Sequence, residues 1–174
     1  KARLSDAAFF YEQDRKKPLA EHGQKLDKTV FHAHLGTLAQ KQERLVKIID
    51  MIEKEEVVAC QDAKEAAGLC KADLMSEMVF EFPELQGVIG SYYAKADGLK
   101  EAVAQAIYDQ YSPKGPSDAL PLQKASQLVA LADRLDTLVG FFSVGLKPTG
   151  SKDPFALRRA ALGIIRFLEA GYEW

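Results

Sequence analysis

Three histidines are the side chains of this sequence whose type and spacing are best suited to binding a metal ion. They are His22, His32 and His34. In an extended segment, a His-x-His pair such as His32 and His34 points both rings to one side of the strand, where they can bind one ion. The surrounding sequence supplies no further ligand set for such a site. We therefore predict packing or surface histidines, and the alternative is a metal site.

Carboxylates form a second candidate for metal chemistry. Asp73 follows Ala72 late in one predicted helix and Asp133 lies on a later one, so both could converge in a helical core. Ala72 stands where a histidine would be needed, and carboxylates without imidazole make a poor transition-metal site. The simpler prediction is that Asp73 and Asp133 form hydrogen bonds or ion pairs near helix surfaces. A metal-dependent hydrolase remains the alternative.

Basic residues cluster in the last third of the chain. Arg159 and Arg166 are seven residues apart and share a helix face, with Arg158 about a quarter-turn away. Such a face could lie against phosphates, to which Arg donates bidentate hydrogen bonds. The alternative is a solvated flank, because acidic residues dilute the charge. The candidate binding residues are Lys147, Lys152, Arg158, Arg159 and Arg166.

Motifs of common enzymes are missing from the sequence. It contains no GxxxxGKS/T phosphate loop, no GxSxG elbow, no HExxH and no Gly-rich dinucleotide turn. Cys60 and Cys70 are ten residues apart without a CxxC pattern, so we predict buried free thiols rather than a disulfide or a zinc site. We predict no catalytic and no metal-binding residues.

Helical periodicity dominates, which predicts one all-α domain of about eight helices. A short extended piece is expected near residues 29–31. The helix at 121–142 carries an apolar stripe from Leu122 to Phe142 and should be central. The Pro- and Gly-rich segment 112–117 is the clearest loop. The predicted helices cover about residues 4–15, 18–26, 37–53, 60–80, 83–97, 99–110, 121–142 and 153–170.

Two helix starts have a physical signature. Thr37 is a plausible N-cap for the helix that follows it. Asp153 can cap exposed amides while Pro154 suits a first turn. The last helix is predicted to turn five apolar side chains inward, those of Leu157, Ala161, Ile164, Ile165 and Leu168.

Composition bounds the class of protein. The chain has 174 residues, 47% hydrophobic and 28% charged, which is typical of a globular domain. No apolar stretch approaches the ~18 residues of a membrane span. The net charge of −2 gives no global basic field of the kind that DNA-binding proteins carry. Because the chain begins Lys1-Ala2-Arg3 without Met or a signal sequence, we expect a cytoplasmic piece excised from a longer chain.

Four segments of the sequence together resemble one family, the beta subunit of heterotetrameric bacterial glycyl-tRNA synthetase. They occur in the family's order and span nearly the whole chain. The segment at 147–160, which reads KPTGSKDPFALRRA, is the most specific. The others lie at residues 2–14, 71–87 and 130–140.

The resemblance implies a share in translation, as part of a ligase that joins glycine to tRNA-Gly with ATP and Mg²⁺. In that family two alpha subunits carry the class II active site and two beta subunits supply most tRNA recognition. The sequence shows no sign of the antiparallel sheet on which a class II synthetase forms its adenylate, so this piece should not be catalytic and should hold no cofactor. Its implied partners are the alpha subunit and tRNA-Gly, with no DNA and no membrane.

This region of the family is similar to HD domains, whose pattern is a first His, a His-Asp doublet and a final Asp. On that pattern Arg44 stands at the first His, Ala72 and Asp73 at the doublet, and Asp133 at the final Asp. Both histidine positions are lost, so the resemblance implies a degenerate site without hydrolase activity. It also implies lead-in helices at 1–36 before an HD-like core at 37–174.

The sequence is compatible with three functions. The favoured hypothesis is that the domain braces tRNA-Gly through the basic stretch from Lys147 to Arg166. The first alternative is a scaffold that holds the subunits together without touching RNA. The second is a metal-dependent HD phosphohydrolase, which Arg44 and Ala72 disfavour.

Overall fold

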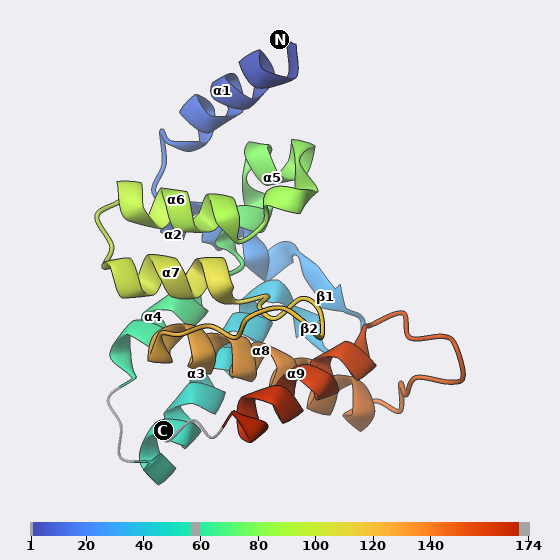
Figure 1. Cartoon of the computed structure of the whole chain (residues 1–174). Coiled ribbons are helices and arrows are strands. Elements are labelled where there is room, and N and C mark those ends of the chain that lie inside the picture. The colour runs from blue at the N-terminus through green and yellow to red at the C-terminus, as the bar shows by residue number, and fades with distance from the viewer. Residues whose placement is uncertain (1, 57–59, 171–174) are drawn as a thin grey trace.

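Helices dominate the computed structural model, which describes residues 2–56 and 60–170 (Figure 1). The predicted all-α bundle is confirmed, whereas the HD-like label stays a prediction. The α-helices of the described residues are α1 (Ala2–Asp14), α2 (Leu19–Gly23), α3 (Leu38–Glu56), α4 (Gln61–Leu69), α5 (Glu77–Glu81), α6 (Val88–Ala96), α7 (Glu101–Asp109), α8 (Lys124–Ser143) and α9 (Leu157–Glu169).

Short elements connect the helices. The predicted extended piece is strand β1 (Val30–His32), which pairs antiparallel with β2 (Gly36–Thr37). The Thr37 hydroxyl accepts a hydrogen bond from the Gln40 amide at 3.3 Å, so the predicted N-cap of α3 is confirmed. The 3₁₀ helices are η1 (Gln24–Lys28), η2 (Ala72–Met75) and η3 (Pro83–Leu85).

Helix α8 lies at the centre of the bundle, as predicted, and contacts α3, α4, α7 and α9 (Figure 1). Its buried side includes Leu128 and Val129. The predicted stripe is nevertheless wrong at both ends. Leu122 precedes the helix and is 93% exposed, while Val139 and Phe142, near the C-terminal end of α8, are also exposed.

The predicted continuous helix at 60–80 is wrong, because the chain ends α4 at Leu69 and turns through η2 before α5. Local side-chain hydrogen bonds favour this break. The Ser76 hydroxyl donates to the Asp73 carbonyl at 2.6 Å and accepts from the Val79 amide at 3.1 Å, which caps α5. Two amides at the start of α5 also donate to the buried carboxylate of Asp14 at the end of α1.

Helix α9 begins later than predicted, at Leu157 rather than near Asp153. The Asp153 carboxylate does cap the helix, accepting from the Leu157 and Arg158 amides at 2.8 and 2.9 Å. Between them the backbone passes through Ala156 in the left-handed conformation, with φ of 53°, so Pro154 lies outside the helix. The prediction of Asp153 as the capping residue is therefore confirmed, whereas the prediction of Pro154 in the first turn is wrong.

The predicted inward face of α9 is partly wrong. Leu157 is buried, but Ile165 is 47% and Leu168 64% exposed, because the helix is rotated about its axis relative to the expectation. Ala161 and Ile164 are half-buried. The residues that pack inward are Leu157, Ala160, Gly163 and Phe167.

Helix α1 extends from one end of the bundle, and α9 lies toward the other (Figure 1). The segment after α1 joins the same hydrophobic core as the later helices, since Leu19 is buried with Leu45 and Ile49. The predicted division at residue 36 into lead-in and core stays a prediction. Within the described part of the chain, no helix combines the length and apolar character needed to cross a membrane.

Candidate nucleic-acid interface

The five basic residues predicted to bind RNA lie on α9 and on the loop before it. Lys147 and Lys152 are exposed on this loop, and Arg158 and Arg159 are exposed on the first turn of α9. Lys152 and Arg159 form no side-chain hydrogen bond or ion pair with any described residue. We call Lys147, Lys152, Arg158 and Arg159 the basic flank.

Two members of the basic flank also contact the protein. The Arg158 guanidinium donates to the Gly150 carbonyl at 2.6 Å, which fixes the loop to the helix. The Lys147 ammonium lies 5.9 Å from the centre of the Phe142 ring. Both side chains remain exposed, so these contacts position charge at the surface without burying it.

Arg166 differs from the other candidates because both ends of its guanidinium are engaged. It donates to the Gly115 carbonyl at 3.0 Å and to the Asp118 carbonyl at 2.6 Å. It is half-buried and anchors the loop between α7 and α8. The sequence spacing correctly predicted that Arg166 lies on the same helix as Arg159. It could not show that Arg166 would bind the loop between α7 and α8.

Two grooves adjoin the basic flank. The first, of about 370 Å³, lies between α9 and the loop at 113–116, and we call it the α9 groove. The second, of about 600 Å³, reaches from the same loop to Asp133 on α8, and we call it the α8 groove. Lys114 and Arg159 line both grooves. Lys114 was missed from the sequence, where only its place in a Pro- and Gly-rich loop marked it.

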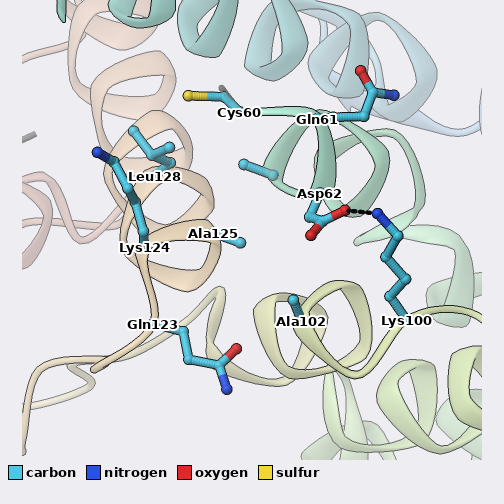
Figure 2. Close-up of a pocket in the computed structure, with 10 residues that line it drawn as sticks. Cys60, Gln61, Asp62, Lys100, Ala102, Gln123, Lys124, Ala125 and Leu128 are labelled. Carbon is cyan, nitrogen blue, oxygen red and sulfur yellow. Dashed lines mark hydrogen bonds and ion pairs between the residues drawn. The ribbon is translucent and has the colours of Figure 1, made fainter. Parts of the chain in front are cut away.

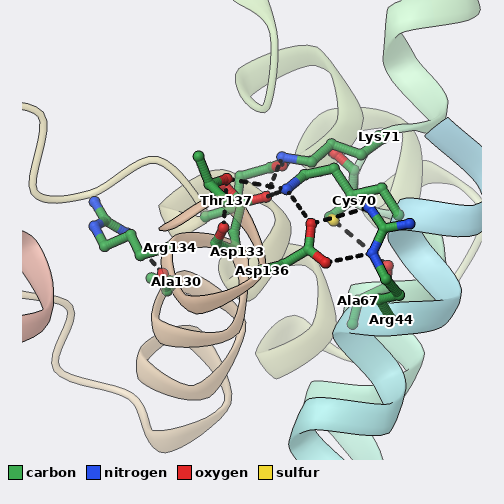
Figure 3. Close-up of polar contacts among 11 residues, drawn as sticks. Arg44, Ala67, Cys70, Lys71, Ala130, Asp133, Arg134, Asp136 and Thr137 are labelled. Carbon is green, nitrogen blue, oxygen red and sulfur yellow. Dashed lines mark hydrogen bonds and ion pairs between the residues drawn. The ribbon is translucent and has the colours of Figure 1, made fainter. Parts of the chain in front are cut away.

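The residues at the predicted HD positions are only partly brought together. Arg44 on α3 and Asp133 on α8 enter one network of ion pairs, which Figure 3 shows between the two helices. The Lys41 ammonium lies 3.1 Å from Asp133 and 2.9 Å from Asp136, and Lys71 lies 3.1 Å from Asp133. Arg44 binds Asp136 through two nitrogens.

Electrostatics in this network favour the charged forms. Burial alone would raise the pKa of the Asp133 carboxyl, but the ammonium groups of Lys71 and Lys41 outweigh it and hold that pKa well below its usual value. Burial acts to lower the pKa of Lys71, and Asp133 reverses the effect and raises it. The predicted ion pairing of Asp133 is therefore present, and its charge is balanced by protein cations.

Asp73 is separate from this network and fully buried, so its predicted place near a helix surface is wrong. One carboxylate oxygen accepts from the Gly87 amide at 2.6 Å and from the Gly90 amide at 3.0 Å. Burial raises the pKa of this carboxyl, and the two amide hydrogen bonds offset part of the rise. Ala72 is buried in the hydrophobic core. Asp73 thus orders the turn into α6.

His22, His32 and both cysteines pack against other residues of the protein. The His22 ring is buried and its Nε2 lies 2.9 Å from the Asp14 carbonyl. His32 packs against Phe141 and Phe155, with ring centres 5.1 and 5.6 Å away. Among the described residues, no group of His, Cys, Asp and Glu has an arrangement that could hold a metal ion. Cys60 and Cys70 are buried, as predicted, and neither forms a disulfide with a described residue.

A further cavity, of about 370 Å³, lies beside Cys60, on the side of Gln61, Ala102 and Leu128 (Figure 2). Figure 2 shows the Asp62 carboxylate facing the Lys100 ammonium, which are 2.7 Å apart. Burial raises the pKa of the Cys60 thiol, which disfavours a reactive thiolate. This cavity lacks the accumulation of cations found beside α9.

Comparison with known proteins identifies the class. Curated glycine--tRNA ligase beta subunits are similar to this chain over nearly all its length. That of Chromohalobacter salexigens is 52% identical over 95% of the chain, and that of Janthinobacterium sp. (strain Marseille) is 54% identical over 97%. That of Phenylobacterium zucineum is 51% identical over 96%. The class is therefore that of aminoacyl-tRNA synthetase subunits.

The particular family follows from a family-wide comparison. The family described as glycyl-tRNA synthetase beta subunit matches residues 1–173. This chain belongs to the glycyl-tRNA synthetase beta subunit family. It spans about a quarter of the length of the relatives it matches, 24% of the first two and 25% of the third.

Proposed function

We propose that this chain supports the recognition and positioning of tRNA-Gly during ATP-dependent glycylation. The observation that carries the proposal is the basic flank, where Lys152 and Arg159 hold exposed charges that no described residue pairs. Family membership supports tRNA-Gly as the RNA. On this proposal the chain performs no chemical step, and ATP and Mg²⁺ are used elsewhere in a synthetase of two alpha and two beta subunits in the cytoplasm.

Electrostatics explains how such a flank could act. Phosphate contacts fix the register and orientation of a nucleic acid, while base contacts carry the sequence information. The flank consists of Lys and Arg on one helix and its preceding loop, which suits the backbone of an RNA helix. It would hold the tRNA in place while other parts of the synthetase identify it.

Steady-state glycylation by the complete synthetase tests this proposal. An Arg158→Ala/Arg159→Ala double variant should raise KM for tRNA-Gly about 5- to 20-fold with little change in kcat, because contacts of equal strength in ground and transition states affect KM alone. Lys47→Ala is the matched control, an exposed lysine on α3 away from both grooves. Equal KM values in the double variant and the control would overturn the proposal.

We further propose that the network around Asp133 stands where an HD domain holds its metal. Lys41 and Lys71 supply the positive charge that balances Asp133. A divalent cation would have to displace both ammonium groups, which supports the absence of hydrolase activity. Release of phosphate from phosphoesters, dependent on Mn²⁺ or Mg²⁺ and lost in Asp133→Asn, would contradict this.

A specific observation favours a second candidate function, that of a scaffold. Ile165 and Leu168 are exposed on α9, on a different side of the helix from Arg159 and Arg166. Exposed apolar side chains grouped on one face are typical of contact surfaces. An Ile165→Ser/Leu168→Ser variant should then weaken assembly of the synthetase without loss of helix content. Unchanged assembly by analytical ultracentrifugation would exclude the scaffold function for this face.

A further inference from the structure

Lys114 occupies the place where the α9 groove and the α8 groove meet. It is exposed on the loop between α7 and α8, and it lines both grooves together with Arg159 of α9. Its ammonium group forms no hydrogen bond or ion pair with a described residue. Two segments far apart in sequence thus present unpaired cations to the same hollow.

The charge around the α9 groove is strongly positive. Lys114, Arg158, Arg159 and Arg166 line it, and Asp153 is the one carboxylate among its lining residues. The Asp153 carboxylate already accepts two amide hydrogen bonds at the start of α9. Positive charge therefore exceeds negative charge in a concave site, where an anion would be attracted.

The loop that carries Lys114 is held from two helices. Arg134 of α8 donates to the Tyr111 carbonyl at 3.2 Å and to the Pro113 carbonyl at 2.8 Å. Arg166 of α9 donates to the Gly115 and Asp118 carbonyls. The loop backbone is therefore fixed on both sides of Lys114.

A third set of hydrogen bonds involves the backbone of Lys114 itself. The Asp118 carboxylate accepts hydrogen bonds from the Lys114 amide and the Gly115 amide, both at 2.9 Å. The main chain at Lys114 is thus ordered while its ammonium group stays free. A fixed backbone lowers the entropy lost when a side chain is immobilised on a ligand.

We infer that Lys114 is a further phosphate-binding residue of the proposed RNA face, and that Arg166 acts through it by holding its loop. The inference rests on the proposed function. The ligand class is the phosphodiester backbone of RNA, bound between the Lys114 loop and Arg159. Arg166 is then a positioning residue, because both terminal nitrogens of its guanidinium donate to loop carbonyls.

Binding of tRNA-Gly by the complete synthetase, measured at several salt concentrations, tests the role of Lys114. Lys114→Ala should raise Kd about two- to five-fold, the range of an exposed charge contact. It should also reduce the slope of log Kd against log salt by about one. Lys47→Ala, which removes the same charge elsewhere, should change neither. A Lys114→Ala variant that behaves as Lys47→Ala would overturn the inference.

Asp118 gives the sharpest test of positioning because charge and geometry predict opposite results. Removing a carboxylate beside the groove should tighten RNA binding if only net charge matters. If the carboxylate orders Lys114, Asp118→Ala should instead weaken binding about two-fold or more, and this loss should vanish in the Lys114→Ala background. Tighter binding in Asp118→Ala would contradict the positioning role.

A double-mutant cycle tests Arg166 in the same way. Arg166→Ala should weaken binding in the wild-type background and have an effect of less than about 1.5-fold in the Lys114→Ala background. Equal effects in both backgrounds would mean that Arg166 meets RNA directly, which would overturn its positioning role. If Arg158→Ala/Arg159→Ala leaves binding unchanged as well, the proposed function itself falls; if only Lys114→Ala is silent, the RNA face stands without Lys114.

Discussion

Asp14 connects three elements through one buried carboxylate. Its two oxygens accept from the Glu77 amide at 2.9 Å, from the Met78 amide at 3.0 Å and from the Tyr93 hydroxyl at 2.8 Å. It thereby joins the end of α1 to the start of α5 and to α6. A carboxylate can accept all three hydrogen bonds. The amide of an asparagine has only one acceptor oxygen, so its NH2 group would face at least one of the three donors.

Asp14→Asn should therefore lower the free energy of unfolding by about 1–3 kcal/mol, the cost of leaving buried polar groups unsatisfied. Urea unfolding followed by circular dichroism measures the change. Asp6→Asn is the control, since Asp6 lies exposed on the same helix. Equal unfolding midpoints for the two variants would show that the Asp14 bonds contribute no net stability.

Gly163 lets α9 lie against the side chain of Arg134. A Cβ atom at this position would come within 2.3 Å of the Arg134 Nε. Arg134 has little freedom to withdraw, because it is buried and its guanidinium is hydrogen-bonded to Ala130, Tyr111 and Pro113. The glycine is thus required by a close approach between two helices.

Gly163→Ala should destabilise the protein by about 1–3 kcal/mol, the usual cost of overpacking. Gly68→Ala offers the opposite case on α4, where nothing lies within 4 Å of the added Cβ. That variant should be neutral or more stable by up to about 1 kcal/mol, because alanine favours helix more than glycine does. Thermal unfolding of the two variants and of the wild type measures these changes. A Gly163→Ala variant as stable as the wild type would show that the Arg134 side chain can move away.

At the scale of elements, the ion-pair network joins α3, the segment before η2, and α8. Arg44 and Lys41 come from α3, Lys71 precedes η2, and Asp133 and Asp136 come from α8. Removing one partner from such a buried network leaves charges uncompensated. The network is therefore a source of stability that depends on pH.

Asp133→Asn should lower the free energy of unfolding by roughly 3 kcal/mol near neutral pH. The Asp133 pKa is lowered by folding, so its contribution is fully present above the unfolded value near 3.8 and is lost as pH falls. The difference between wild type and variant should therefore narrow below pH 4. Asp73 has the opposite sign, because folding raises its pKa. Because Asp73 is present in both wild type and Asp133→Asn, its contribution cancels when the stabilities of these two proteins are subtracted.

Urea unfolding at pH 7 and pH 3 measures this difference, with Asp27→Asn as an exposed control on η1. The control should change stability little at either pH. A constant gap between wild type and Asp133→Asn at both values would mean that the loss does not arise from ionic pairing.

Helix starts were predictable from the sequence where the signal is local. The side chains of Thr37 and Asp153 accept hydrogen bonds from amides only a few residues further along the chain, so their capping roles were identified correctly. The break after Leu69 was not, because it depends on Asp14 and on Gly87, which lie far along the chain. Periodicity in an Ala-rich segment cannot register such tertiary hydrogen bonds.

The rotation of α9 was missed for a related reason. Its sequence offers apolar residues on more than one side, so periodicity alone does not choose between Ile165 and Phe167 as the inward residue. The close approach of Gly163 to Arg134 makes the choice. Lys114 was not predicted from the sequence, because it comes to line the same grooves as Arg159 only when α7, α8 and α9 pack together.

On the scale of the whole molecule, basic side chains are clustered although the net charge is only −2. Basic side chains gather along the α9 groove, while on the other flank of α9 apolar side chains are exposed. The two flanks suit different contacts. This separation allows RNA binding and subunit assembly to be tested by independent substitutions.

The salt dependence of tRNA-Gly binding by the complete synthetase tests the central claim most directly. Each phosphate contact releases counterions and contributes about one unit to the slope of log Kd against log salt. A variant with all four residues of the basic flank replaced by alanine should lose about three to four units of slope and bind more weakly. An unchanged slope would contradict the claim that this flank contacts RNA.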